Sequence, residues 1–105
     1  MNKTIMLDGR EVRVEMSADT LRVYRKEFGR DLMKDMMAVK DELDLEMVEN
    51  LFYVCAAACD PEIPPIDDWL KQYSPFALYQ ASQELIAMWV DSNKTTTQRK
   101  KKADR

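Results

Sequence analysis

Histidine is absent from this chain of 105 residues, and glycine occurs only twice. Without histidine, the commonest general base and metal ligand in proteins is missing. Gly9 and Gly29 both fall where a turn or a helix end needs them, which leaves no glycine-rich loop to hold a phosphate. Most of the 19 carboxylates stand beside lysine or arginine, a pattern typical of solvated surface charge. The sequence therefore predicts a protein that is not an enzyme and holds no cofactor.

Cysteine and long apolar runs are also scarce. Cys55 and Cys59 stand one helical turn apart, which is poor geometry for a disulfide, and a metal site would need two further ligands. We expect both to be small core residues and expect no metal. No uncharged apolar run approaches the ~20 residues of a membrane span, and residues 1–3 lead straight into the first predicted strand without a signal segment. We expect a soluble, cytoplasmic protein without a membrane partner.

Charge is unevenly distributed along the chain. Residues 91–105 hold six basic and two acidic side chains, a net charge of +4, so the rest carries −7 within the total of −3. Since proteins gain most of their affinity for duplexes by placing cations against phosphates, an acidic body argues against nucleic-acid binding. The end of the chain has no hydrophobic period. We therefore predict one domain over residues 1–92 and a disordered basic tail over residues 93–105.

The stretch from Ile5 to Met16 predicts a β-hairpin. Asp8-Gly9 lies between two runs of alternating character, and both residues tolerate the positive φ angles of a type I′ turn. Pairing across this turn sets Leu7 opposite Arg10. The residues of one face are then all apolar: Ile5, Leu7, Val12, Val14 and Met16.

Helices follow the hairpin, and most begin at a residue that suits an N-cap. The predicted caps, with the helices that follow them, are Ser17 for residues 18–28, Asp31, Asp44, Asp67 and, for the last helix, Ser74 before Pro75. The third helix has the clearest amphipathic period and is the predicted centre of the core. Residues 60–65 are rich in proline and predict a stiff extended connection. The fold class is α+β, mainly α, with the hairpin packed on a bundle of four to five helices.

Methionine and tryptophan supply the candidate binding residues. Met33, Met36 and Met37 lie on the second predicted helix, where methionine either fills irregular gaps in a core or forms an adaptable surface for partners. Trp69 and Trp89 are second candidates, each either a core ring or an anchor for a partner. In the last helix one predicted apolar stripe holds Phe76, Tyr79, Ser82, Ile86 and Trp89.

The order and spacing of these motifs resemble the tail assembly chaperone family of long-tailed bacteriophages. The resemblance rests on the Asp8-Gly9 hairpin, the Ser-capped helix with Tyr24-Arg25, the segment Phe28-Gly29-Arg30-Asp31-Leu32, and a proline-rich loop before Asp67-Asp68-Trp69-Leu70 and the final helix. It covers residues 4–92. It implies a non-catalytic chaperone that binds the phage tape-measure protein and keeps it soluble in the host bacterial cytoplasm, and that is missing from the mature virion.

The resemblance also implies further partners. Members of this family are often made in two lengths by ribosomal frameshifting, and the longer form recruits the tail-tube protein. Lys100-Lys101-Lys102 is compatible with an adenine-rich slippery run in the gene. An exposed apolar face would additionally favour a homo-oligomer. Two alternatives stay open: a small helical DNA-binding or regulatory protein that uses the basic tail and the helix break at Gly29, and a structural component of the tail.

Overall fold

The chain begins with a two-stranded antiparallel hairpin formed by β1 (Asn2–Leu7) and β2 (Arg10–Glu15). In this computed structural model, the backbone is described for residues 1–38 and 44–103, and the side chains for 1–38 and 44–92. Leu7 pairs with Arg10, and Ile5 with Val12. Asp8 and Gly9 have φ angles of 52° and 77°, as a type I′ turn requires. The predicted turn and register are confirmed.

Five helices follow: α1 (Ala18–Phe28), α2 (Leu32–Met37), α3 (Leu45–Ala57), α4 (Ile66–Leu70) and α5 (Ala77–Ala103). Three predicted caps are confirmed, because side-chain oxygens of Ser17, Asp31 and Asp44 each accept a first-turn amide. Gly29 ends α1 with a φ angle of 64°. The fold is thus α+β and mainly α, as predicted.

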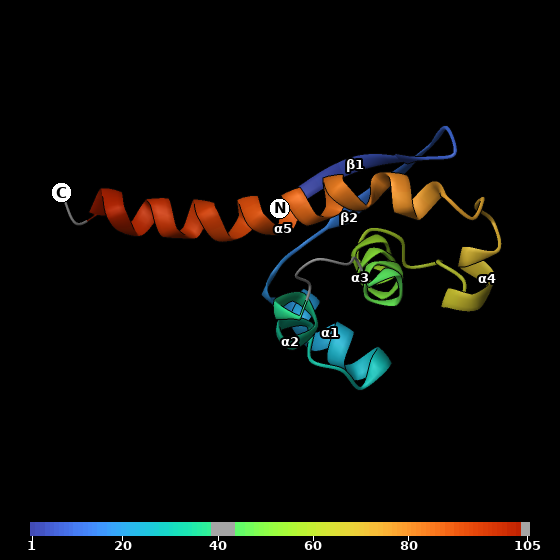
Figure 1. Ribbon diagram of the computed structural model, residues 1–105, viewed down its shortest axis with the longest axis horizontal. Coiled ribbons are helices and arrows are strands. Elements are labelled where there is room, and N and C mark those ends of the chain that lie inside the picture. Colours follow the sequence, from blue (N-terminus) through green and yellow to red (C-terminus); the bar gives the residue numbers. More distant parts are fainter. Residues whose placement is uncertain (39–43, 104–105) are drawn as a thin grey trace.

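Helix α3 lies at the centre of the core, with α1, α2, α4, α5 and the hairpin around it (Figure 1). Its predicted place at the centre of the core is confirmed, since nine of its residues are buried. The apolar face of the hairpin closes one side of the core through Ile5, Leu7 and Val14. A lone hairpin is marginal in water, so packing on α3 and α5 is what stabilises it.

The predicted starts of the last two helices, α4 and α5, are wrong. Helix α4 begins after Pro65, and Asp67 lies within its first turn instead of capping it. Helix α5 begins at Ala77, because Ser74 is engaged elsewhere. The Ser74 amide and hydroxyl both donate to the carboxylate of Asp8 in the hairpin turn, at 2.6 and 2.8 Å. Because Ser74 bonds Asp8 in this tertiary contact, its hydroxyl does not cap α5.

A second contact between the hairpin and the segment before α5 lies next to the one between Asp8 and Ser74. Arg10 lies over the ring of Tyr73, 5.4 Å from its centroid, and donates a hydrogen bond to the Gln72 carbonyl. Together with Asp8 and Ser74 these residues tie the hairpin turn to the segment between α4 and α5. The turn accordingly points toward the end of the molecule where α4 lies (Figure 1).

Helix α5 crosses the hairpin and continues beyond the other elements (Figure 1). Its bounds run past residue 92, where the predicted domain ended. The predicted disordered basic tail, residues 93–105, lies outside the residues whose side chains are described, and it stays a prediction. Within the described ranges, no helix combines the length and the hydrophobicity needed to cross a membrane.

Candidate partner-binding surface

The three candidate methionines of α2 divide between the surface and the core. Met33 and Met37 are 46% and 74% exposed, and their spacing of four residues places them on the same side of the helix. Met36 is half-buried and packs against the core, as does the fully buried Leu32. Met36 thus fills the core, as one interpretation predicted, while Met33 and Met37 are accessible and their role as a surface for partners stays a prediction.

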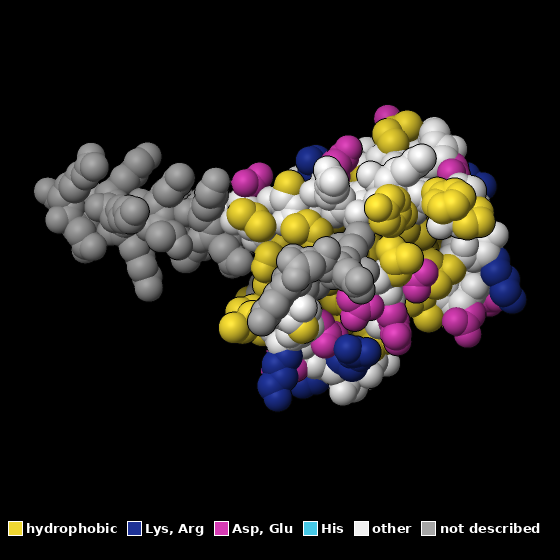
Figure 2. Space-filling model, in the orientation of Figure 1, with side chains coloured by type: hydrophobic (Ala, Val, Ile, Leu, Met, Phe, Trp, Pro, Cys, Tyr) yellow, Lys and Arg dark blue, Asp and Glu magenta, His cyan; other side chains and the backbone are white. Residues whose placement is uncertain are grey.

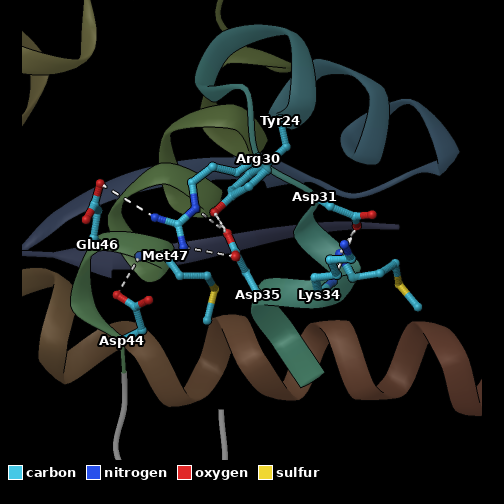
Figure 3. A network of polar contacts seen from close by, with 9 residues as sticks. Tyr24, Arg30, Asp31, Lys34, Asp35, Asp44, Glu46 and Met47 are labelled. Atoms are coloured by element: carbon cyan, nitrogen blue, oxygen red, sulfur yellow. Dashed lines mark hydrogen bonds and ion pairs between the residues drawn. The ribbon is translucent and has the colours of Figure 1, made fainter. Parts of the chain in front are cut away.

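A polar network fixes the orientation of α2 (Figure 3). The Tyr24 hydroxyl donates to Asp35 Oδ2 at 2.8 Å. Arg30 donates to both oxygens of the same carboxylate through Nε and Nη2, at 3.0 Å each. On its other side the Arg30 guanidinium lies 4.0 Å from Glu46 of α3. One carboxylate of α2 is therefore held by α1 and by the loop after it, and that loop reaches α3.

Burial strengthens this network. The Asp35 side chain is only 11% exposed, and charge-assisted hydrogen bonds are stronger out of water. Burial, followed by the hydrogen bond to Asp35, raises the pKa of Tyr24 well above its usual value, so the hydroxyl stays a donor across the physiological range. A helix of six residues would not persist alone. Its tie to Tyr24 and Arg30 is what presents Met33 and Met37 to solvent.

A second set of exposed apolar side chains lies along α5 and at Phe76, the residue before it. Phe76, Tyr79 and Val90 are exposed and Ile86 is half-buried, and Tyr79, Ile86 and Val90 fall within roughly 40° of the helix circumference. We call these four residues the α5 stripe. The side of α5 that enters the core is a different one, formed by Leu78, Ser82, Leu85 and Met88.

The predicted stripe of the last helix therefore needs correction. Phe76 and Tyr79 lie at the surface, while Ser82 is buried and donates a hydrogen bond to the Tyr79 carbonyl at 2.6 Å. Leu45, the first residue of α3, is also exposed. Figure 2 shows hydrophobic side chains along α5 and around the ends of α2 and α3 on the face in view. The sequence held no signal for these exposed residues beyond the breadth of the apolar pattern in α5.

The two tryptophans are less exposed than Met33 and Met37. Trp69 is 4% exposed, and its ring makes edge contacts with Tyr53 and Tyr73. Its interpretation as a core ring is confirmed, and a partner would reach it only if the core opened. Trp89 is half-buried and packs against the core from α5. Met33, Met37 and the α5 stripe are thus the accessible candidates.

Comparison with known proteins adds no constraint at this point. No protein-family model, curated protein or solved structure matches this chain.

The structure also shows where the cysteines and the metal-ligating side chains of the described residues lie. In the part of the chain that the structure describes, no group of three metal-ligating side chains comes together. Cys55 is buried, and burial raises the pKa of its thiol to about 12, so it stays protonated and unreactive. The exposed apolar side chains of α2 and α5 are the feature that calls for a function.

Proposed function

We propose that this protein is a tail assembly chaperone, a non-catalytic protein that binds the tape-measure protein of a long-tailed phage and keeps it soluble during tail assembly. The observation that supports this proposal is the set of exposed apolar side chains, Met33 and Met37 on α2 and the α5 stripe, on a well-packed body. Tape-measure proteins are long and helical, and their apolar helix faces would aggregate if left uncovered. The resemblance of residues 4–92 to the chaperone family supports the same proposal.

The mechanism is reversible masking of apolar helix faces. Methionine has a flexible, polarisable side chain that fits differently shaped partners, which suits a chaperone that must cover many segments of one long protein. Burying one such side chain fully contributes about 1.5–3 kcal/mol. A few side chains of this kind give binding that is strong enough to hold the partner and weak enough to release it.

The chaperone would work in the cytoplasm of the infected bacterium and leave before the virion is complete. A longer frameshifted form, if the gene encodes one, would recruit the tail-tube protein. The basic tail need not contact nucleic acid in this function, and the protein should pass through heparin at moderate salt. Its absence from purified particles would separate a chaperone from a structural tail component.

The direct test replaces the exposed methionines. We expect Met33→Ser together with Met37→Ser to reduce co-purification with the tape-measure protein by about tenfold or more, because two apolar contacts are lost. The double variant should keep its helicity and melting temperature, since both side chains face solvent. Solubility of the co-expressed tape-measure protein is the second measurement.

A matched control is available on the hairpin. Met6 is 53% exposed, similar to Met33, but it lies on β1 and belongs neither to α2 nor to the α5 stripe. Met6→Ser should leave the partner soluble. Equal effects of the control and the double variant, or no effect of either, would count against the proposed surface.

A further inference from the structure

Strand β2 has a free edge, since the sheet that the structure describes has only two strands. The hydrogen-bond pattern fixes which residues point outward. The Met1 ammonium donates to the Met16 carbonyl and the Met16 amide donates to the Met1 carbonyl, both at 2.8 Å. Paired residues alternate between bonded and non-bonded positions along an antiparallel ladder. Val12, four residues before Met16, is therefore bonded to β1, and the backbone groups of Glu11 and Arg13 face away from β1.

Space is available next to these groups. A cavity of about 300 Å³ lies along the strand, bounded on one side by Glu11, Val12 and Arg13 and on the other by Ile63, Pro64 and Tyr73, among others. Edges of sheets are often covered by a loop or a helix, which prevents pairing with other chains. Here the proline-rich segment and β2 line the same cavity, which leaves space beside the strand.

The charges on this edge are unpartnered. Glu11 and Arg13 are exposed, and neither has an ion pair within the described part of the chain. Their cross-strand neighbours on β1 are Met6 and Thr4, which carry no charge. Charged side chains on an edge usually discourage pairing. Two opposite charges that stand two residues apart can instead favour pairing with a second copy of the same strand. When the two strands run antiparallel, the acidic residue of each copy lies opposite the basic residue of the other.

We infer that two copies of this chain pair through β2, antiparallel and centred on Val12. Glu11 of each copy then faces Arg13 of the other, and both residues are outward-facing, so backbone and side chains pair at the same two positions. Val12 of each copy faces Val12 of the other at the apolar border of the cavity. The two hairpins become one four-stranded sheet.

The charges of β2 favour a second copy of this chain as the strand that pairs with its free edge. The outward residues of β1 are Asn2, Thr4 and Met6, by the same alternation, and they offer no charge to complement Glu11 or Arg13. The contacts of Arg10 with Tyr73 and Gln72 hold the β2 end of the hairpin in place, so the edge is ordered before it pairs. This interface uses neither the methionines of α2 nor the α5 stripe, and it does not depend on the proposed function.

Charge reversal at the two positions tests this pairing. Glu11→Arg alone and Arg13→Glu alone each place like charges opposite one another twice in the dimer. Each single variant should weaken the dimerisation constant by about tenfold or more, because cross-strand charge pairs change sign at two symmetric positions. Glu11→Arg combined with Arg13→Glu restores complementarity and should return the constant to within about threefold of the wild type.

Mixing supplies the decisive arm. An equimolar mixture of the two single variants should form a heterodimer, since the paired arginines of the Glu11→Arg variant meet the paired glutamates of the Arg13→Glu variant. Sedimentation equilibrium at about 150 mM salt measures all of these constants on the full chain, and circular dichroism checks that each variant is folded. A wild type that stays monomeric at the highest concentration, single variants that dimerise as well as the wild type, or a double variant and a mixture as weak as the single variants would each overturn the inference.

Discussion

Removal of one hydroxyl tests the network that orients α2. In Tyr24→Phe the hydrogen bond to Asp35 is lost while the ring stays in the core. Hydrogen bonds to charged groups contribute about 1.5–3 kcal/mol. Both oxygens of Asp35 keep their bonds to Arg30, so no acceptor is left without a partner, and the cost should lie at the lower end. We expect the free energy of unfolding to fall by about 1.5 kcal/mol.

The assay is urea unfolding followed by circular dichroism, supported by hydrogen exchange. A loss of this size lowers the melting temperature by roughly 6–12 °C in a domain of this size. Exchange of the α2 amides should quicken more than that of the α3 amides, because the lost hydrogen bond holds Asp35 of α2, whereas α3 is held by its nine buried residues. Tyr79→Phe is the matched control, since Tyr79 is 55% exposed and its hydroxyl makes no hydrogen bond within the described part of the chain.

A double-mutant cycle with Asp35→Ala separates the hydrogen bond from other effects of the substitution. The coupling between Tyr24 and Asp35 should be about 1 kcal/mol or more. A coupling near zero would refute the reasoning, as would a Tyr24→Phe variant whose unfolding free energy lies within about 0.3 kcal/mol of the wild type.

Other outcomes follow from the core and the hairpin turn. Hydrogen bonds from the amide and hydroxyl of Ser74 hold the pKa of Asp8 below its usual value of 3.8. The stability that these bonds give is therefore complete above about pH 5 and is lost as pH falls through the lowered pKa. Asp8→Asn should flatten this acid limb of a pH titration of stability; an unchanged limb would count against the contact. In the folded protein, iodoacetamide should modify Cys59 and spare Cys55, and mass spectrometry of the peptides reads the result. Leu51→Ala should cost about 2–5 kcal/mol of unfolding free energy, whereas Leu45→Ala at the exposed start of α3 should cost far less.

Features set by neighbouring residues were predictable from the sequence. The Asp8-Gly9 turn fixes the hairpin register through its own φ preferences, and the caps at Ser17, Asp31 and Asp44 each bond an amide two or three residues away. The central position of α3 also followed from its own apolar period. Each of these needs only a few adjacent residues to be decided.

Features set by distant residues were not predictable in the same way. Ser74 has the chemistry of an N-cap, but Asp8, 66 positions earlier, binds it instead. Apolar residues occur on more than one side of α5, and only the placement of α3 and β1 decides that Leu85 is buried while Tyr79 is exposed. The division of the methionines in α2 likewise depends on Tyr24 and Arg30, which are not part of that helix.

The contact between Asp8 and Ser74 also bears on the order in which the protein folds during synthesis. The ribosome releases the hairpin first, and its turn finds its anchor only after the segment before α5 has emerged, 66 residues later. Until then the hairpin turn lacks this anchor and the hairpin has only α3 and the earlier helices to pack on, and hairpins with little to pack on are marginal in water. A nascent chain that pauses before Ser74 should therefore remain sensitive to protease at the hairpin. Emergence of Ser74 is the step that closes the N-terminal end of the fold.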